Sequence, residues 1–240
     1  MPAPLPFSPQ RALAIGAHPD DVEFHAGGTL RRLVQEGAEV TLLVCSDGGR
    51  GGAVGAVGAG EAAVVRRAEQ DAAAGLLGVA RLVWLGLPDG ELAAGDPLRA
   101  ELALAIRRVR PELVLAHDPD GLWTVVGGIA QPKHSDHRAA GQAAIDACYP
   151  RAASPHYHPE QLAEHGLKPW YPRELWLFDT GAPDLRVEIA DTLACKLDAL
   201  RQHASQEAVA GGLVAPARVH AAHWGSEQQP AEPFIRLRLY

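Results

Sequence analysis

Cysteine is scarce in this chain. Its 240 residues contain three cysteines, Cys45, Cys148 and Cys195, which lie far apart and among apolar residues. An odd number of dispersed thiols does not form a disulfide framework, so reduced cysteines and a cytoplasmic location are expected.

Long apolar runs and blocks of like charge are also missing. No apolar run reaches about 18 residues, and Met1 to Gln10 lacks the basic and apolar regions of a signal peptide, so we expect a soluble, unexported protein. The 22 Lys and Arg stand against 29 Asp and Glu, a formal net charge of −7 at pH 7. Without a basic block, neither nucleic acid nor a membrane is an expected partner. The sequence favours a small-molecule partner and leaves a homo-oligomer open.

Strand-like runs alternate with helical patterns along most of the chain. The strand-like runs are 12–17, 39–45, 81–85, 112–116 and 174–178, and the expected helices are 27–36, 61–77, 97–110, 137–148 and 191–205. Such alternation predicts a Rossmann-like three-layer α/β/α fold with a mostly parallel sheet.

The length suits a single domain spanning residues 1–240. Residues 150–172 are rich in proline, histidine and aromatic residues, and we expect them to form an excursion near the site. The glycine-rich stretch 48–60 is expected to be a mobile loop, because it has too few apolar side chains to order itself by burial.

Ionisable residues follow four of the expected strands. In open α/β sheets ligands bind beyond the carboxyl ends of the strands, so these positions matter most. The four segments are His18–Asp21, Ser46–Arg50, Gly86–Gly90 and His117–Asp120. We therefore expect polar groups to converge on one edge of the sheet.

Two histidine and aspartate clusters offer metal ligands. His18 and Asp21 flank a turn stiffened by proline, so both can reach one ion at about 2.0–2.2 Å. The cluster His134–His137 stands before an expected helix and offers a third ligand. Three protein ligands with an open position suit catalytic zinc. The ligand set is also similar to the facial triad of iron oxygenases, so Fe²⁺ is an alternative metal. Those oxygenases usually have β-barrel folds, whereas this chain alternates strands and helices. We therefore prefer hydrolysis as the reaction.

Several motifs together carry a family resemblance over most of the chain. They are Ala17–Val22, Gly27–Leu30, Asp47–Gly51, Arg67 and Glu69, Leu77–Val79, Leu85–Gly90, Arg110–Pro111 and His134–Arg138. With these motifs the chain resembles the PIG-L/LmbE family of zinc-dependent N-deacetylases. The His-Pro-Asp-Asp and His-x-Asp-His motifs are specific as a pair, whereas the glycine-rich pieces alone are weak.

The resemblance implies the metal ligands and the base. It makes His18, Asp21 and His137 the zinc ligands, and Asp20 the base that takes a proton from the zinc-bound water. Reasoning from the residues alone leads to the same role for Asp20. Asp20 is adjacent to a metal ligand, but a three-ligand site does not need it as a ligand. A carboxylate beside metal-bound water is well placed to act as a general base.

The resemblance also implies residues for the substrate. His134 would be the cation that stabilises the oxyanion of the reaction. Asp136 would orient the His134 ring and favour its charged form, and Arg50 would bind the substrate. The expected substrate is an N-acylated amino sugar or sugar conjugate. Many family members have Glu where this chain has Gly49, which puts the substrate's identity in doubt.

Five further histidines are expected outside the metal site, and two alternative functions are considered. His25 is expected at the start of a helix, with a place behind the metal ligands as the alternative. We expect four other histidines on the surface, with the mouth of the pocket as the alternative: His117, His156, His158 and His165. An iron-dependent oxygenase and a non-catalytic metal- or sugar-binding module are the alternatives. The presence of both Asp20 and His134 argues against the binding module, which would need neither.

Overall fold

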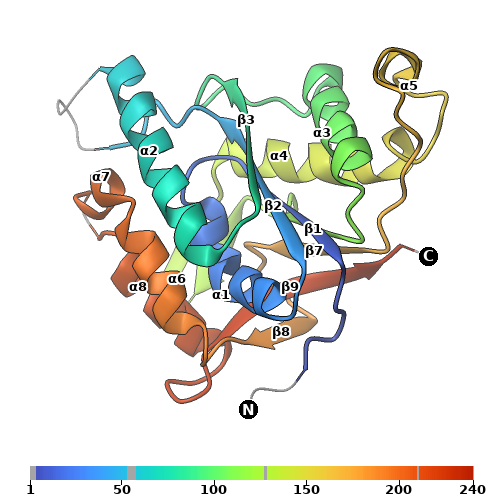
Figure 1. The fold of residues 1–240 in the computed structure, drawn as a ribbon. Coiled ribbons are helices and arrows are strands. Elements are labelled where there is room, and N and C mark those ends of the chain that lie inside the picture. Colours follow the sequence, from blue (N-terminus) through green and yellow to red (C-terminus); the bar gives the residue numbers. More distant parts are fainter. Residues whose placement is uncertain (1–3, 53–57, 127–128, 210, 240) are drawn as a thin grey trace.

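A seven-stranded sheet runs through the protein in the order β3-β2-β1-β4-β7-β9-β8 (Figure 1). The computed structural model describes residues 4–52, 58–126, 129–209 and 211–239. The strands are β1 (Arg11–Gly16), β2 (Glu39–Ser46), β3 (Arg81–Leu87), β4 (Leu113–His117), β7 (Glu174–Phe178), β8 (Leu185–Glu188) and β9 (Ala231–Arg238). Strands β3, β2, β1, β4 and β7 are parallel, whereas β9 is antiparallel to both of its neighbours. The expected mostly parallel sheet is confirmed.

Helices cover both faces of this sheet, which confirms the three-layer architecture (Figure 1). One layer holds α1 (Asp21–Gln35), α2 (Ala59–Leu77), α6 (Leu193–Arg201), α7 (Ala204–Glu207) and α8 (Val214–Trp224). The other holds α3 (Asp96–Val109), α4 (Ser135–Asp146) and the irregular turn η1 (Ala147–Arg151), and α5 (Pro159–His165) lies at its corner. The short strands β5 (Trp123–Val126) and β6 (Ile129–Pro132) form a separate antiparallel hairpin.

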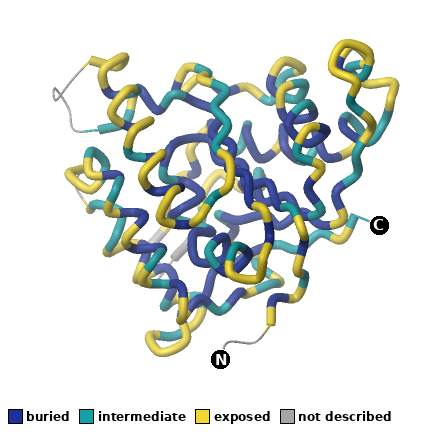
Figure 2. The backbone as a smooth tube through the Cα atoms, viewed as in Figure 1, coloured by how far each residue is buried: buried dark blue, intermediate teal, exposed yellow. Residues whose placement is uncertain are grey.

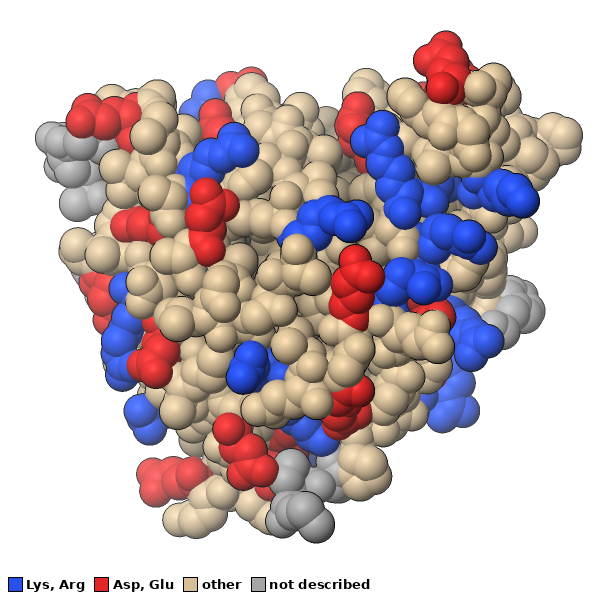
Figure 3. Space-filling view, viewed as in Figure 1, with Lys and Arg blue, Asp and Glu red and all other residues tan. Residues whose placement is uncertain are grey.

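The parallel strands are apolar because they are covered on both faces. Ala12, Leu13, Ala14 and Ile15 of β1 are all fully buried. Figure 2 shows the buried residues concentrated along the central strands and the facing sides of the helices. The face seen in Figure 3 carries acidic and basic side chains side by side. Among the described helices, none is both long and apolar enough to cross a membrane.

Several boundaries differ from the expectations. Helix α1 begins at Asp21 rather than at Gly27, so His25 lies inside the helix rather than at its start. The helix expected over 191–205 is two helices, because the backbone at His203 leaves the helical conformation. Of the expected mobile loop 48–60, residues 53–57 lie outside the described part of the chain, and α2 already begins at Ala59. Helix α8 and strands β5, β6, β8 and β9 were not predicted.

Helix α1 is held against the sheet by an unusually close contact and by a buried ion pair. A Cβ at Gly28 would lie 2.7 Å from Cγ2 of Ile189, so only glycine fits there. The Glu232 carboxylate of β9 accepts hydrogen bonds from the backbone N–H of Gly28 and of Thr29, and pairs with Lys196 Nζ at 2.6 Å. These contacts fix the position of α1, and with it the position of the segment that precedes it.

Candidate metal centre

The turn from β1 into α1 places three ionisable residues, His18, Asp20 and Asp21, at the carboxyl edge of the sheet. Asp20 has a φ of 90°, in the left-handed region that non-glycine residues seldom adopt. Two side chains of α2 hold this strained turn. Arg66 Nη2 donates to Pro19 O at 2.6 Å and to Asp20 Oδ2 at 2.8 Å, and the Asp20 N–H donates to Gln70 Oε1 at 3.0 Å. Hydrogen bonds with helix α2 therefore stabilise the strained backbone conformation of this turn.

His18, Asp21 and His137 meet at this edge, with one ligand atom from each lying within 4.8 Å of the others. His137 Nε2 is 3.1 Å from Asp21 Oδ1, and His18 Nδ1 is 3.6 Å from Asp21 Oδ2. Ligands at about 2.1 Å from a tetrahedral ion are about 3.4 Å apart. The two observed separations, which involve different oxygens of Asp21, lie on either side of that value, so the three side chains are close enough together to bind one ion.

The charges of the site also call for a cation. Burial alone would lower the pKa of His18, but the carboxylates of Asp136, Asp21 and Asp89 outweigh burial and raise this pKa to about 12. The pKa of His137 rises to about 9 for the same reason, with Asp21 and Asp179 opposing burial. Without a metal, protons on these rings balance the carboxylates. A divalent cation would replace those protons, so the donor set fits a divalent metal ion in charge as well as in spacing.

His137 and Asp21 each contact a second side chain on the side that faces away from the other. Asp179 Oδ2 lies 3.3 Å from His137 Nδ1, the ring nitrogen that faces away from Asp21. His117 Nε2 lies 3.1 Å from Asp21 Oδ2, and the His117 ring stacks on His137 with centroids 4.2 Å apart. Such outer partners fix the orientation of metal ligands and strengthen binding. The expectation that His117 is a surface residue was wrong: it is fully buried.

Asp179 was missed by the sequence analysis, although a signal for it existed. It directly follows β7, so the rule applied to the other four parallel strands also applies to it. Its backbone is left-handed, with a φ of 58°. Unlike the segments after β2 and β3, which also offer a single Asp without a histidine, the segment after β7 matches none of the motifs that carry the family resemblance, and it therefore did not stand out.

Asp136 lies closer to His18 than to His134, the residue with which the sequence analysis paired it. Asp136 Oδ2 lies 3.3 Å from His18 Nε2 and accepts from Gly90 N, while its other oxygen is 4.0 Å from His134 Nδ1. Asp89 Oδ1 contacts the same His18 nitrogen at 3.1 Å. Asp136 and Asp89 thus support His18 as Asp179 supports His137. The reason is topological, because the loop after β3 carries Asp89 and Gly90 over the start of α4.

The surroundings of His134 disfavour the positive charge expected of it. It is the N-cap of α4, and its Nδ1 accepts a hydrogen bond from the Asp136 backbone N–H at 3.1 Å. Burial, together with the nearby charges of His18 and His137, lowers the pKa of His134 below its ordinary value despite Asp136. Because Nδ1 accepts a hydrogen bond, Nε2 is the ring nitrogen that is free to donate one.

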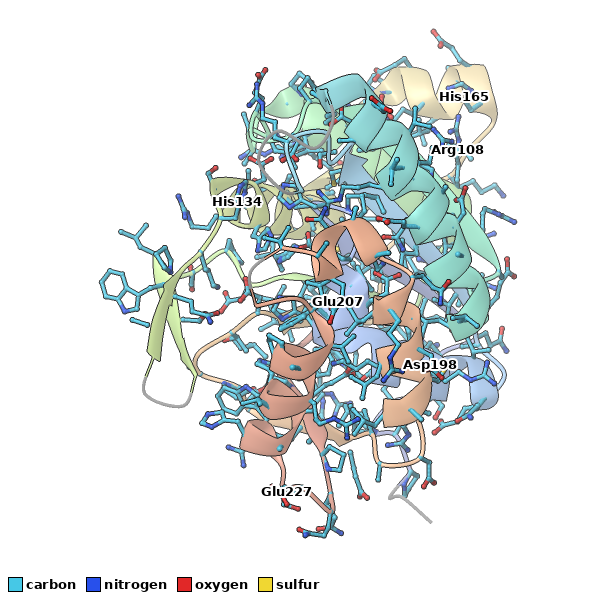
Figure 4. The ribbon with its side chains drawn as sticks, turned by 90° about the vertical axis from the view of Figure 1, so that its left-hand side faces the viewer. Arg108, His134, His165, Asp198, Glu207 and Glu227 are labelled. Atoms are coloured by element: carbon cyan, nitrogen blue, oxygen red, sulfur yellow. The ribbon has the colours of Figure 1, made fainter. Side chains whose placement is uncertain are left out.

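A cavity of about 360 Å³ opens over these residues. This volume lies in the range of small-molecule sites, roughly 300–1,000 Å³. The lining residues are His18, Asp20, Asp21, Arg50, Gly51, Arg66, Asp89, Gly90, His134, His137 and Gln206. Arg50 stands at the rim, more than half exposed, and pairs with Glu91. Figure 4 shows His134 where the β5–β6 hairpin, which projects from the body of the molecule, leads into α4.

The chain is similar to known proteins over most of its length. The PIG-L family model, described as GlcNAc-PI de-N-acetylase, matches residues 13–148. Diacetylchitobiose deacetylase of Thermococcus kodakarensis is 35% identical, over 82% of this chain and 70% of the relative. A 1D-myo-inositol 2-acetamido-2-deoxy-alpha-D-glucopyranoside deacetylase of Rhodococcus erythropolis is 32% identical, over 62% of this chain and 58% of its own length.

A solved structure extends the similarity to the fold. The N,N'-diacetylchitobiose deacetylase from Pyrococcus horikoshii superposes with a TM-score of 0.84 at 29% identity. The match covers 96% of this chain and 84% of that one. The similarity therefore includes β8, β9 and the helices that follow β7, beyond the segment matched by the family model.

The support that Asp179 gives to His137 can be tested by metal binding. We expect Asp179→Asn to weaken zinc affinity about 10- to 100-fold, because an amide no longer holds the imidazole in its ligating orientation as strongly. Competition with a chromophoric chelator measures the affinity. Asp191→Asn, at an exposed aspartate, is the matched control. Equal affinities in wild type and Asp179→Asn would show that Asp179 does not support the ligand.

Proposed function

Since the chain belongs to the PIG-L family of de-N-acetylases, we propose that it hydrolyses the N-acetyl group of a small amino sugar or sugar conjugate in a metal-dependent reaction. The observation that carries the proposal is the set His18, Asp21 and His137, held at ligand spacing at the base of a cavity that also contains Asp20 and His134. The named relatives act on diacetylchitobiose and on an acetamido sugar of inositol. The family favours hydrolysis over the oxygenase alternative.

The proposed metal ligands are His18, Asp21 and His137, and zinc is the proposed metal. Two imidazoles and one carboxylate are a common set in zinc hydrolases, with the fourth position open. When bound there, zinc supplies Lewis-acid activation of water and of the amide carbonyl. The same ligands also accept Fe²⁺, so the metal has to be measured.

Asp20 is the proposed general base. It lines the cavity, and its carboxylate faces Arg66 rather than a ligand position. Burial raises the pKa of Asp20 to about 7 against the opposing charge of Arg66. A base is most effective when its pKa lies near the working pH. As water adds to the amide carbon, Asp20 takes a proton from it and returns this proton to the leaving nitrogen as the C–N bond breaks. The products are the amine and acetic acid, which ionises to acetate.

His134 is proposed to bind the carbonyl oxygen, and Arg50 the sugar. The His134 ring donates through Nε2 from a half-exposed position, so the bond strengthens as negative charge develops on the oxygen. Arg50 presents its guanidinium at the rim beside Glu91, where the pair can contact sugar hydroxyls. Asp136 acts through His18 and is therefore a positioning residue.

Two further proposals concern the chain as a whole. Residues 1–240 form one domain, because both helical layers pack on the same sheet. The protein works in the cytoplasm, a proposal supported by the free thiols of Cys45, Cys148 and Cys195.

A deacetylation assay tests the proposed function. Purified protein is stripped with a chelator, reloaded with Zn²⁺ or, anaerobically, with Fe²⁺, and incubated with N-acetylglucosamine, N,N'-diacetylchitobiose or a GlcNAc-inositol. We expect release of equal amounts of acetate and free amine in the metal-loaded protein only. Failure to release either product from all three sugars with both metals would overturn the proposal.

The ligand assignment predicts a contrast among three variants. His137→Ala and Asp21→Ala should lose both bound zinc and activity, because each removes one of three ligands. His134→Ala should keep zinc and lose activity, because the ring contacts the substrate rather than the metal. Metal analysis of the three purified proteins decides the matter. Full zinc occupancy in His137→Ala would show that the ligand is misassigned.

Asp20→Asn tests the base separately from the metal. We expect zinc to stay bound while kcat/KM falls about 10²- to 10⁴-fold, the usual cost of losing a general base. Steady-state kinetics on protein of measured zinc content provide the comparison, with Asp191→Asn as the control. Undiminished turnover in the zinc-loaded variant would exclude Asp20 from this role.

A further inference from the structure

One side chain of the metal cavity takes no part in the reaction proposed above. Gln206 lines the cavity beside Arg50 and Gly51, and it belongs to the four-residue helix α7. A Cβ at Gly51 would lie 3.1 Å from Gln206 Oε1, so the Gln206 amide reaches the loop that follows β2. Gln206 lies beyond residues 13–148, the segment that the family model matches. The C-terminal part of the chain therefore contributes to the cavity as well.

Helix α7 is held in place by a carboxylate of α2. Glu69 Oε1 accepts a hydrogen bond from Ser205 N at 2.7 Å, and Glu69 Oε2 accepts one from Ser205 Oγ at 2.7 Å. A helix of four residues has too few internal hydrogen bonds to be stable alone, so such contacts determine where it lies. Glu69 belongs to one of the motifs that carry the family resemblance, and its contact with Ser205 is a role that the motif alone did not indicate.

Ser205 determines which end of the Gln206 amide faces the cavity. Gln206 Nε2 lies 3.1 Å from Ser205 Oγ. The Ser205 hydroxyl has a single proton and donates it to Glu69, because an ionised carboxylate can only accept. The serine oxygen can therefore only accept from Gln206, so the NH₂ group of the amide must lie on that side. The amide oxygen, Oε1, is thereby directed to Gly51 and the cavity.

The amide of the substrate has a donor as well as an acceptor. Its carbonyl oxygen is proposed above to accept from His134, so its N–H needs an acceptor inside the cavity. The three carboxylates that line the cavity already have roles in proton transfer, in metal binding and in contacting His18, and they are Asp20, Asp21 and Asp89. A glutamine oxygen, in contrast, can accept from the N–H of the substrate and from the amine of the product alike.

We propose that Gln206 Oε1 accepts a hydrogen bond from the nitrogen of the substrate. Glu69, which acts through Ser205, is then a positioning residue that keeps this oxygen directed into the cavity. The inference rests on the proposed function and deepens it, because it assigns the residue that recognises the nitrogen at the bond to be cleaved.

Two substitutions test these roles by steady-state kinetics. Gln206→Met removes the amide at nearly constant length. In Glu69→Gln, the Ser205 N–H retains the oxygen of the new amide, whose NH₂ group then faces Ser205 Oγ. The serine proton turns to Gln206, and the Gln206 amide reverses. The matched controls are Gln228→Met, at an exposed glutamine, and Glu61→Gln, at an exposed position of α2.

The expected effect is on substrate binding rather than on turnover. For the best substrate among the three acetylated sugars, KM should rise about tenfold in both variants, as for the loss of one hydrogen bond. The kcat should stay close to wild type, because this bond is made before and during the reaction alike. Both controls should match wild type. A fall in kcat at unchanged KM would overturn the assignment of Gln206 to substrate binding.

A binding measurement separates this inference from the proposed function. Glucosamine, which keeps the nitrogen, and 2-deoxyglucose, which has no polar group at that carbon, are titrated into the zinc-loaded proteins and followed by ligand-observed NMR. We expect Gln206→Met and Glu69→Gln to bind glucosamine about tenfold more weakly than wild type and the controls do. All five proteins should bind 2-deoxyglucose equally.

The outcomes of this titration are distinct. Lack of glucosamine binding by the wild type, or unchanged glucosamine affinity in Gln206→Met, would overturn the inference. An equal loss for both sugars would overturn it too, because Gln206 would then contact a hydroxyl. Wild-type behaviour of Glu69→Gln alone would overturn the positioning role. The expected pattern, in a protein that releases acetate from none of the acetylated sugars, would support the role of Gln206 and overturn only the proposed function.

Discussion

Carboxylate repulsion at the edge of the sheet is the constraint on which the site depends. Five aspartates gather there, namely Asp20, Asp21, Asp89, Asp136 and Asp179, most of them buried or nearly so. In a medium that screens charge poorly, such a cluster is stable only if cations stand among the carboxylates. Arg66 and the imidazoles of His18 and His137 fill these places in the chain itself, and the spacing of the ligands leaves room for one divalent ion.

Repulsion among the carboxylates also explains why each proposed histidine ligand contacts a further aspartate. The ring nitrogen of His18 that faces away from Asp21 contacts Asp89 and Asp136, and the equivalent nitrogen of His137 contacts Asp179. Each carboxylate is thereby balanced by a ring, and each ring is held in one orientation. Binding of the metal and order of the protein are therefore coupled. Asp20 contacts Arg66 instead of a ring, which supports its proposed role as the base.

The sequence predicted those features that depend only on residues close together in the chain. The five parallel strands were found because they are buried on both faces, and the clusters around His18 and His137 because their residues are adjacent in the chain. What could not be predicted depends on distant contacts. Strand β9 returns antiparallel between β7 and the edge strand β8, and Asp179 reaches His137 across about forty residues. The pairing of Asp136 with His18 rather than with the neighbouring His134 shows that proximity in sequence misleads where a loop from another strand intervenes.

Gly28 takes no part in the proposed chemistry, yet the geometry of the site depends on it. Its backbone lies so close to Ile189 that any side chain would force α1 away from the sheet. Asp21 is the first residue of α1, and His18 lies three residues before it, so a displaced helix would carry both side chains away from His137. A substitution remote from the cavity would therefore disturb the site through the position of a whole helix.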